Sequence, residues 1–246
     1  MSGATAASLP VPSDPPPSDG VLRYLGIEGC IRLPFTVDAA SLRDELDRLP
    51  QGTWTRADRD PVVQAHVESF FAIGHPRGPR PLPPEDRAPL AALPKLRVLL
   101  RERIGAEPRR AIVARLRAGG FIPIHTDTPR FFRGTVRLSL QIDADGPQRL
   151  YCNGLWYEME PGEVWAVDNL RPHAVWNAGR GPRVNVLADY VPSSALVETI
   201  VAGERGRGVD DPPARREIES MTRRHYRRSR WRSVRYELFK LVWRRR

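Results

Sequence analysis

Hydrophobic and polar residues alternate over several short segments in the second half of the chain. These segments are rich in Val, Ile, Trp and Tyr, and turn residues separate them at intervals of about ten residues. Such a series of short alternating strands is typical of an all-β sandwich or barrel. The predicted strands are "AIVARLR", "FIPIH", "TVRLSLQI", "LWYEM", "EVWAVD", "HAVWN" and "RVNVLADYV". We therefore expect a mainly β fold of the jelly-roll kind, with helices packed outside.

Helical periodicity precedes this region. Asp38 is placed as an N-cap before an amphipathic helix that Pro50 ends. A second helix is expected from about Pro84 to Ile104, and Pro94 should split or kink it. The hydrophobic residues on one face of the first helix are Leu42, Leu46 and Leu49. Together the two helices are expected to cover one face of a sheet.

The other segments complete the predicted organisation. Residues 1–20 are rich in Pro, Ser and Ala and predict a disordered leader. Residues 24–35 predict one or two strands, and residues 51–84 predict a long surface loop of the kind that often forms a lid. We therefore divide the chain into a leader (1–20), one domain (21–200) and a helical C-terminal extension (201–246).

The charge of the chain is concentrated in its tail. The formal charge is +10, but residues 221–246 hold eleven Arg or Lys and a single acid, so the first 220 residues carry 28 bases and 28 acids. Spacing on a helix aligns Trp231, Val234, Leu238 and Leu241. Such a basic helix suits an anionic membrane surface or an acidic protein partner, with packing on the β core or on a second subunit as the alternative. Without a recognised nucleic-acid-binding motif, nucleic acid is not an expected partner.

The remaining composition indicates a compartment. Cys30 and Cys152 are the two cysteines, too few for a disulfide framework, and we expect both to be buried. The N-terminus has prolines where a signal peptide needs an apolar stretch, and no segment approaches the length of a membrane span. A cytoplasmic location is expected, with peripheral membrane association through the tail left open.

Candidate chemistry begins at "FIPIHTDTPR". His125 and Asp127 lie two residues apart at the end of a strand, so both side chains can point to one side, and His173 on a distant strand can complete a face. Two imidazoles and one carboxylate with open positions form the facial triad that suits non-heme Fe(II). The pair also fits a polar turn in which the aspartate accepts hydrogen bonds from backbone amides. Arg183, ten residues after His173, can bind a carboxylate bidentately.

Longer motifs carry a resemblance to a known family. The runs "ARLRAGGFIPIHTDTP", "RLSLQI" and "YEMEPGEVWAVDNLRPHAVWNAGRGPRVNVLADY" occur in this order. They resemble the aspartyl/asparaginyl β-hydroxylase family of iron- and 2-oxoglutarate-dependent dioxygenases, which includes bacterial amino-acid hydroxylases. The resemblance covers about residues 83–192.

The resemblance implies a cupin-like double-stranded β-helix and assigns roles to site residues. Arg183 matches the arginine that anchors the distal carboxylate of 2-oxoglutarate, and Arg137 matches a strand arginine near this cosubstrate. Ser139 stands where many members have histidine, which puts that contact in doubt, whereas Asp127 keeps an aspartate that some relatives replace with glycine. The implied Fe(II) ligands, which are also the catalytic residues, are His125, Asp127 and His173.

The implied reaction consumes O2 and 2-oxoglutarate at Fe(II). It hydroxylates an unactivated carbon of an amino acid, or of a peptidyl or carrier-bound aminoacyl substrate, and releases succinate and CO2. Two alternatives remain open. One is a non-catalytic jelly-roll binding module that its basic tail docks on a membrane or partner, and the other is a zinc hydrolase, which would leave Arg183 without a cosubstrate.

Other side chains have less specific patterns. Arg130 and Arg133, in "PRFFRG", are predicted to contact substrate, with an exposed basic turn as the alternative. Asp168 and Asn169 could orient His173, although an Asp-Asn pair favours a plain turn. Two further sets are expected to be structural or solvated: the core tryptophans Trp156, Trp165 and Trp176, and the loop histidines His66 and His75. The substrate and the oligomeric state are left open.

Overall fold

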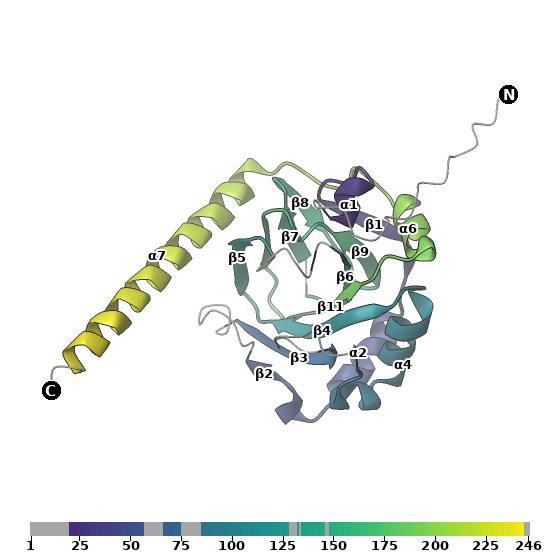
Figure 1. The fold of residues 1–246 in the computed structure, drawn as a ribbon, viewed down its shortest axis with the longest axis horizontal. Coiled ribbons are helices and arrows are strands. Elements are labelled where there is room, and N and C mark those ends of the chain that lie inside the picture. The colour runs from purple at the N-terminus through teal and green to yellow at the C-terminus, as the bar shows by residue number, and fades with distance from the viewer. Residues whose placement is uncertain are drawn as a thin grey trace.

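Two antiparallel β-sheets form the centre of the computed structural model (Figure 1). The structure describes residues 20–56, 66–74, 85–127, 132, 134–145 and 148–243, with backbone alone at residue 148 and from residue 228 onward. The larger sheet has the strand order β1-β9-β6-β11-β4-β3-β2, and the smaller sheet has the order β5-β10-β7-β8. This architecture confirms the mainly β, jelly-roll fold expected from the alternating pattern.

The strands of both sheets follow the predicted segments closely. The larger sheet consists of β1 (Cys30–Thr36), β2 (Thr55–Arg56), β3 (Val67–Ile73), β4 (Pro108–Leu116), β6 (Val136–Asp143), β9 (Glu163–Val167) and β11 (Arg183–Tyr190). The smaller sheet consists of β5 (Phe121–His125), β7 (Gln148–Cys152), β8 (Leu155–Glu158) and β10 (His173–Asn177). Strand β7 was not predicted. Its hairpin signal is nevertheless present, because Asn153 and Gly154 join β7 to β8 with φ values of 50° and 90°, as a tight hairpin turn requires.

The two faces of the larger sheet differ in chemistry. Side chains at alternate positions point to opposite faces. On one face, β6 and β11 bury the apolar residues Leu138, Leu140, Ile142, Val184, Val186, Ala188 and Tyr190 in the main hydrophobic core. On the other face the same strands bury the polar residues Arg137, Ser139, Gln141, Arg183, Asn185 and Asp189. The space between the sheets therefore has a polar section lined by β6 and β11.

The interior between the sheets also has an apolar section. Trp165 of β9 packs there against Leu150 and Cys152 of β7. Trp156 and Trp165 are 1% and 0% exposed, and Trp176 is partly buried, which confirms that the tryptophans belong to the core. Cys30 and Cys152 are buried and unbridged, also as expected.

Helices cover the apolar face of the larger sheet. They are α2 (Ala39–Asp47), the 3-10 turn η2 (Ala88–Ala92), α4 (Pro94–Val98) and the π-helical turn η3 (Leu99–Arg103). Asp38 caps α2 by accepting a 3.0 Å hydrogen bond from the amide of Ser41. The expected break at Pro94 is confirmed, since α4 begins there. Buried Glu45 of α2 accepts hydrogen bonds from the amides of Lys95 and Leu96 at 2.8 and 3.1 Å, so it satisfies the first turn of α4.

Two local predictions need correction. Residues 21–24 form the short helix α1 (Val21–Tyr24), and the strand expected from residue 24 begins only at Cys30. The long loop expected over residues 51–84 contains the 3-10 turn η1 (Gln51–Thr53) and strands β2 and β3. Strand β3 pairs with β4, about forty residues later, so its conformation depends on a contact that no local pattern shows. Residues 57–65 and 75–84 lie outside the described residues, and the lid stays a prediction.

The C-terminal part of the chain contains two helices. Helix α6 (Ser194–Val201), which was not predicted, is capped by the Ser193 hydroxyl, and the expected tail helix is α7 (Pro212–Trp243). The first half of α7 packs on β5 and the second half extends away from the sheets (Figure 1). This first half precedes the apolar stripe for which packing on the β core was the alternative, so that alternative stays a prediction. The predicted stripe at Trp231, Val234, Leu238 and Leu241 lies outside the described side chains.

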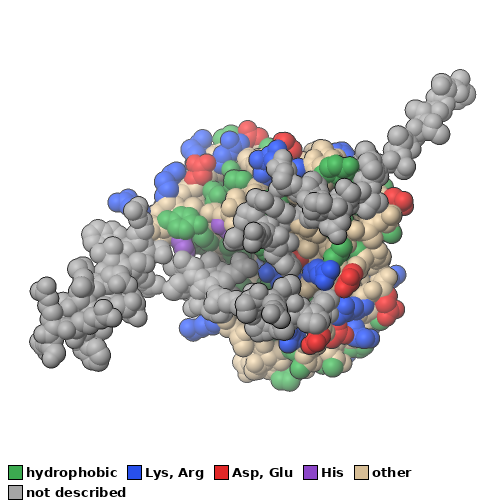
Figure 2. All heavy atoms as spheres, viewed as in Figure 1, with side chains coloured by type: hydrophobic (Ala, Val, Ile, Leu, Met, Phe, Trp, Pro, Cys, Tyr) green, Lys and Arg blue, Asp and Glu red, His purple; other side chains and the backbone are tan. Residues whose placement is uncertain are grey.

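The described surface has no single charged patch on the face shown in Figure 2, where basic and acidic side chains are interspersed. On the described surface as a whole, ion pairs join Arg115 to Glu68 and Arg101 to Asp86. Among the helices of the described residues, none combines the length and apolar character that a membrane span requires.

Candidate metal centre

His125, Asp127 and His173 converge at one end of the smaller sheet. His125 is the last residue of β5, His173 is the first of β10, and the two are direct partners in the antiparallel pairing of these strands. Asp127 follows β5 by two residues. One potential ligand atom of each residue lies within 4.8 Å of those of the other two. The structure therefore brings together all three side chains that the sequence singled out.

Backbone carbonyls orient both imidazole rings in the same way. Nδ1 of His125 lies 2.8 Å from the carbonyl oxygen of Pro123, and Nδ1 of His173 lies 2.9 Å from that of Arg171. Because a carbonyl only accepts, each Nδ1 carries the hydrogen and each Nε2 keeps its lone pair for a ligand. Burial lowers the pKa of His173 to about 3, and the neighbouring His125 acts in the same direction. The neutral rings are the form that binds a metal.

The carboxylate of Asp127 is held from one side. Its Oδ2 accepts hydrogen bonds from Nη1 of Arg137 and, at 2.9 Å, from the side-chain amide of Asn169. Its Oδ1 lies 3.8 Å from Nε2 of His125, on the side of the imidazoles. Burial alone would raise the pKa of Asp127, but Arg137 and the other neighbours outweigh it and hold this pKa well below its usual range. Asp127 is therefore ionised and offers one oxygen to a cation.

Asp127 belongs to a buried chain of alternating charges. Nε of Arg137 donates to Asp189 at 2.9 Å, and Nη2 of Arg110 lies 2.7 Å from the same carboxylate. Both guanidinium groups lie over the ring of Phe132, at 4.8 and 4.9 Å from its centroid. No sequence pattern singled out Arg110 or Asp189 as residues of the site. The available signal was an aspartate at a core position of the strand "RVNVLADYV", which needs a buried cation.

Asn169 lies in a turn, as expected, and it also supports Asp127. Besides its side-chain hydrogen bond, its carbonyl accepts from the amide of Asp127 at 3.0 Å. It therefore fixes the aspartate rather than His173. Asp168 is buried, and burial raises its pKa. Among the described residues, the hydrogen-bond partner of the His173 ring is the Arg171 carbonyl and neither Asp168 nor Asn169.

Arg183 is a buried cation without an anionic partner among the described residues. Its side chain is 2% exposed, and its Nε and Nη1 atoms have no hydrogen-bond partner in the part of the chain that the structure describes. Burial lowers the pKa of Arg183 to about 10. It lies on the face of β11 that also carries Asp189, and hence on the interior side of the sheet. A buried guanidinium is costly unless an anion meets it, so this position calls for an anionic ligand.

Two other interior residues of β6 differ in their surroundings. Arg137 contacts the carboxylates of Asp127, a candidate metal ligand, and of Asp189. Ser139, at the position where many relatives have histidine, accepts a 3.1 Å hydrogen bond from Gln141, whose Oε1 is buried without a partner among the described residues. Gln141 is the cross-strand partner of Asn185 on β11. These amides extend the polar interior from Arg137 toward the end of β11 where Arg183 lies.

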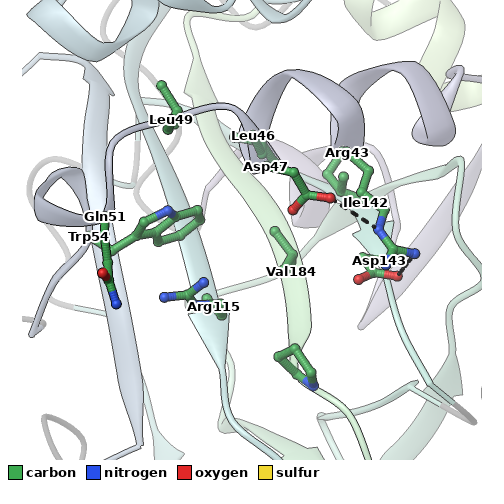
Figure 3. Close-up of a pocket in the computed structure, with 11 residues that line it drawn as sticks. Arg43, Leu46, Asp47, Leu49, Gln51, Trp54, Arg115, Ile142, Asp143 and Val184 are labelled. Atoms are coloured by element: carbon green, nitrogen blue, oxygen red, sulfur yellow. Dashed lines mark hydrogen bonds and ion pairs between the residues drawn. The ribbon is translucent and has the colours of Figure 1, made fainter.

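Of the remaining candidates, only His66 lies within the described residues. Arg130 and Arg133 lie outside the described residues, as does His75. His66 accepts a 3.0 Å hydrogen bond from Arg117 at the surface, as a solvated histidine does. A hollow of about 360 Å³ lies on the opposite face of the larger sheet, where Trp54, Arg115 and Val184 line it (Figure 3). It is separate from the three candidate ligands.

Comparisons with known proteins agree with this geometry. Residues 84–192 match the family model for aspartyl/asparaginyl beta-hydroxylase. No curated protein sequence matches the chain significantly. The match contains all three candidate ligands, Arg137 and Arg183, and it ends before α7.

Several solved structures are similar to parts of this chain. A 2OG-Fe(II) oxygenase family protein from Burkholderia pseudomallei has 18% identity and a TM-score of 0.49, over 77% of this chain and 89% of that one. A prolyl-4-hydroxylase from Pseudomonas putida has 18% identity and a TM-score of 0.43, over 70% and 97%. A Trichoplax adhaerens prolyl hydroxylase, solved with a hypoxia inducible factor peptide fragment, has 15% identity and a TM-score of 0.44, over 74% and 92%. Residues 84–192 are thus similar to the aspartyl/asparaginyl β-hydroxylase family, and this match supports a hydroxylase of the dioxygenase class.

Proposed function

We propose that this protein is an Fe(II)- and 2-oxoglutarate-dependent dioxygenase that hydroxylates an unactivated carbon of an amino acid, free or within a peptidyl or carrier-bound substrate. One observation carries the proposal. The same polar interior holds a two-histidine, one-carboxylate donor set and a buried arginine that has no anion beside it among the described residues.

The donor set fits Fe(II). Two neutral Nε2 atoms and one ionised carboxylate oxygen converge from one side, which leaves the other coordination positions for cosubstrates. The second partners of all three ligands are in place: two backbone carbonyls for the imidazoles, and Arg137 with Asn169 for the carboxylate. A closed structural zinc site would instead use four protein ligands, usually including thiolates.

The environment of Arg183 fits a dicarboxylate cosubstrate. One carboxylate of 2-oxoglutarate can accept two parallel hydrogen bonds from one edge of a guanidinium, which would give the buried Arg183 side chain an anion that the described residues do not supply. The 2-oxo acid end can then reach the metal. We propose Arg183 as the main anchor of 2-oxoglutarate, and Arg137 as a residue beside it that chiefly holds Asp127.

The overall reaction balances without a further reductant. Substrate C–H, 2-oxoglutarate and O2 give substrate C–OH, succinate and CO2. Bound Fe(II) supplies the activation of O2 that this oxidation needs. The protein's own residues have three tasks: the ligands present lone pairs in a fixed orientation, Arg137 and Asn169 keep Asp127 ionised and in place, and the tight interior excludes water from the reacting groups.

The proposed substrate site uses two arginines that follow the candidate ligand Asp127 in the chain. Arg130 and Arg133 follow Asp127 closely in the chain, so we propose that they contact the substrate. Their positive charge would suit the carboxylate of an amino acid or an acidic group of a carrier. Replacing each with Ala should raise the KM for the substrate and leave the affinity for 2-oxoglutarate unchanged.

The non-catalytic and hydrolytic alternatives account for fewer of the observations. A binding module has no need for three ligands with aligned lone pairs, or for a buried cation with no described partner. A zinc hydrolase would use the ligands but would leave Arg183 without a function. The oxygenase hypothesis uses both features.

The direct test is a turnover assay on anaerobically purified protein. The protein receives Fe(II), ascorbate, 2-oxoglutarate and a panel of amino acids and peptides, and succinate and oxygenated products are measured by mass spectrometry. We expect succinate to form with at least one substrate, together with a product that has gained one oxygen atom. Failure to bind Fe(II), together with no consumption of 2-oxoglutarate under any condition, would rule the proposal out.

The roles of the chain ends remain proposals. We propose a dioxygenase domain over residues 21–200 and an extension over 201–246, with a cytoplasmic location. Contact of residues 221–246 with an anionic membrane or an acidic protein rests on their charge alone. Co-sedimentation with anionic and with neutral vesicles tests the membrane version, since only anionic vesicles should retain the protein, and less so at high salt.

A further inference from the structure

Helix α7 covers the open edge of the strand that carries a candidate metal ligand. Strand β5 is the outermost strand of the smaller sheet and pairs only with β10 within the described sheet. An edge strand has backbone groups that face away from its neighbour and need another partner or water. The first half of α7 lies along this edge (Figure 1).

Two side chains of α7 hold one residue of β5. The hydroxyl of Thr222 accepts a hydrogen bond from the amide of Ile124 at 3.1 Å, and the hydroxyl of Tyr226 donates one to the carbonyl of Ile124, also at 3.1 Å. Residues four apart lie on the same side of a helix, so one helical face meets both backbone groups of Ile124. Ile124 directly precedes His125.

Packing fixes the helix in this position. Ala214 and Ile218 are 7% and 0% exposed and pack with Trp156 and Ala174 of the smaller sheet. The ring of His225 meets that of Phe121, at the start of β5, edge-on at 6.3 Å. At the N-terminal end, Asp211 accepts a hydrogen bond from the amide of Ala214 and a 2.6 Å charged hydrogen bond from Arg149 of β7. The helix is therefore anchored to the sheet both before the contact with Ile124 and within it.

The two histidines differ in how their strands are supported. His173 begins β10, which is paired on both sides, with β5 and with β7. His125 ends β5, which is paired on one side, and its side chain is 25% exposed whereas His173 is 5% exposed. Support for the free side of β5 has to come from outside the sheet. Helix α7 supplies it, although it lies beyond the residues that match the family.

We propose that Thr222 and Tyr226 are positioning residues of the metal centre, which set the position of His125 through the backbone of Ile124. The inference rests on the proposed function, because it concerns the same metal site. It assigns residues 212–227 of the extension to the catalytic scaffold. Truncation after residue 211, which removes α7, should therefore weaken metal binding.

The test uses point variants in the full chain. Thr222→Val removes the acceptor for the Ile124 amide, Tyr226→Phe removes the donor to its carbonyl, and Thr222→Ser restores a hydroxyl. Matched controls are Thr199→Val, whose hydroxyl bonds within helix α6, and Tyr24→Phe, whose ring is 48% exposed on α1. Co(II) affinity is measured by visible absorption, and amide hydrogen exchange is measured over residues 121–125.

We expect the double variant Thr222→Val/Tyr226→Phe to raise the Kd for Co(II) about tenfold, the lower end of the effects seen for groups that orient metal ligands. Exchange over β5 should speed up, Thr222→Ser should stay near the wild-type Kd, and both controls should match the wild type. Faster exchange with an unchanged Kd would reduce α7 to a structural cover and overturn the inference, as would equal losses in the controls. If the wild-type chain itself binds no Co(II), the proposed function fails together with this inference. Wild-type binding that the variants retain removes this inference alone.

Discussion

Arg137 donates a hydrogen bond to the oxygen of Asp127 that faces away from the two candidate histidine ligands. The relationship leaves the other oxygen, 3.8 Å from Nε2 of His125, directed toward a metal. It also keeps the aspartate ionised inside the protein, because a buried carboxylate without a cation would take up a proton instead.

Replacing Arg137 with Gln should therefore weaken metal binding. The variant leaves Asp127 and Asp189 buried without their shared cation, so we expect a 10- to 100-fold higher Kd for Co(II) and a loss of about 3 kcal/mol in unfolding free energy. Calorimetric titration and urea unfolding measure the two effects. Arg115→Gln, which removes an exposed ion pair with Glu68, is the control and should cost less than about 1 kcal/mol. Wild-type metal affinity in Arg137→Gln would contradict this role for the arginine.

The three candidate ligands should be separable from folding. His125→Ala and Asp127→Ala are expected to abolish stoichiometric Fe(II) binding, measured by metal analysis after desalting, because each removes one of three donors. Circular dichroism should show that both variants remain folded, since the apolar core lies mainly on the other face of the larger sheet. His66→Ala, at the surface, should bind iron like the wild type. Equal unfolding of both ligand variants would make these residues part of the core instead.

Arg183→Met should have opposite effects on stability and on cosubstrate binding. Met removes a buried charge that has no described partner, and such apolar replacements are often neutral or stabilising by about 1–4 kcal/mol. The ligand-free variant should therefore unfold at the same temperature as the wild type or higher. Adding 2-oxoglutarate with Co(II) should raise the melting temperature of the wild type more than that of the variant. A variant that is less stable without ligand, yet equally stabilised by 2-oxoglutarate, would show that Arg183 has a structural role.

Glu163 predicts a pH dependence that is independent of metal. Burial raises the pKa of Glu163, but hydrogen bonds from the amide of Glu160, from Arg32 and from Trp165 outweigh this and lower the pKa below its usual 4.5. A lowered folded-state pKa gives stabilisation that is complete above the ordinary pKa and is lost as the pH falls below it. Glu163→Gln should thus cost about 1–3 kcal/mol at pH 7, and the difference from the wild type should shrink between about pH 5 and pH 3.

Urea unfolding at several pH values measures this difference. Glu158→Gln is the matched control, because Glu158 is exposed on strand β8 of the smaller sheet, and its replacement should cost less than about 1 kcal/mol. A constant difference between Glu163→Gln and the wild type across this range would show that the carboxylate is not the group that titrates.

Local patterns in the sequence were sufficient for most of the fold. The strand "TVRLSLQI" alternates with a period of two, and the structure contains it as β6 with one apolar face and one polar face. Asp38 and Pro94 mark a helix start and a helix break for reasons that involve only their nearest neighbours. Strand β3 escaped prediction because its pairing with β4 comes from residues about forty positions away.

The candidate site also has features that local patterns predicted and features that depend on long-range contacts. The H-x-D spacing placed His125 and Asp127 together because they lie at the end of β5 and directly after it, and the motif order supplied His173 and Arg183. The charge chain through Arg137, Asp189 and Arg110 was not visible, since it depends on which side chains of four separate segments meet in the interior. The hydrogen bond from the turn residue Asn169 to Asp127 was not visible for the same reason.

The sequence by itself determined the strand pattern, the potential ligands and the location of the charge, because periodicity, residue chemistry and composition are properties of short stretches of chain. Only the tertiary structure decided that Asp127 is held by Arg137, that Arg183 is buried with no described anion beside it, and that Thr222 and Tyr226 meet the strand of His125. Those relationships join residues between ten and about one hundred positions apart. Burial and geometry create them when the chain folds, and no local pattern encodes them.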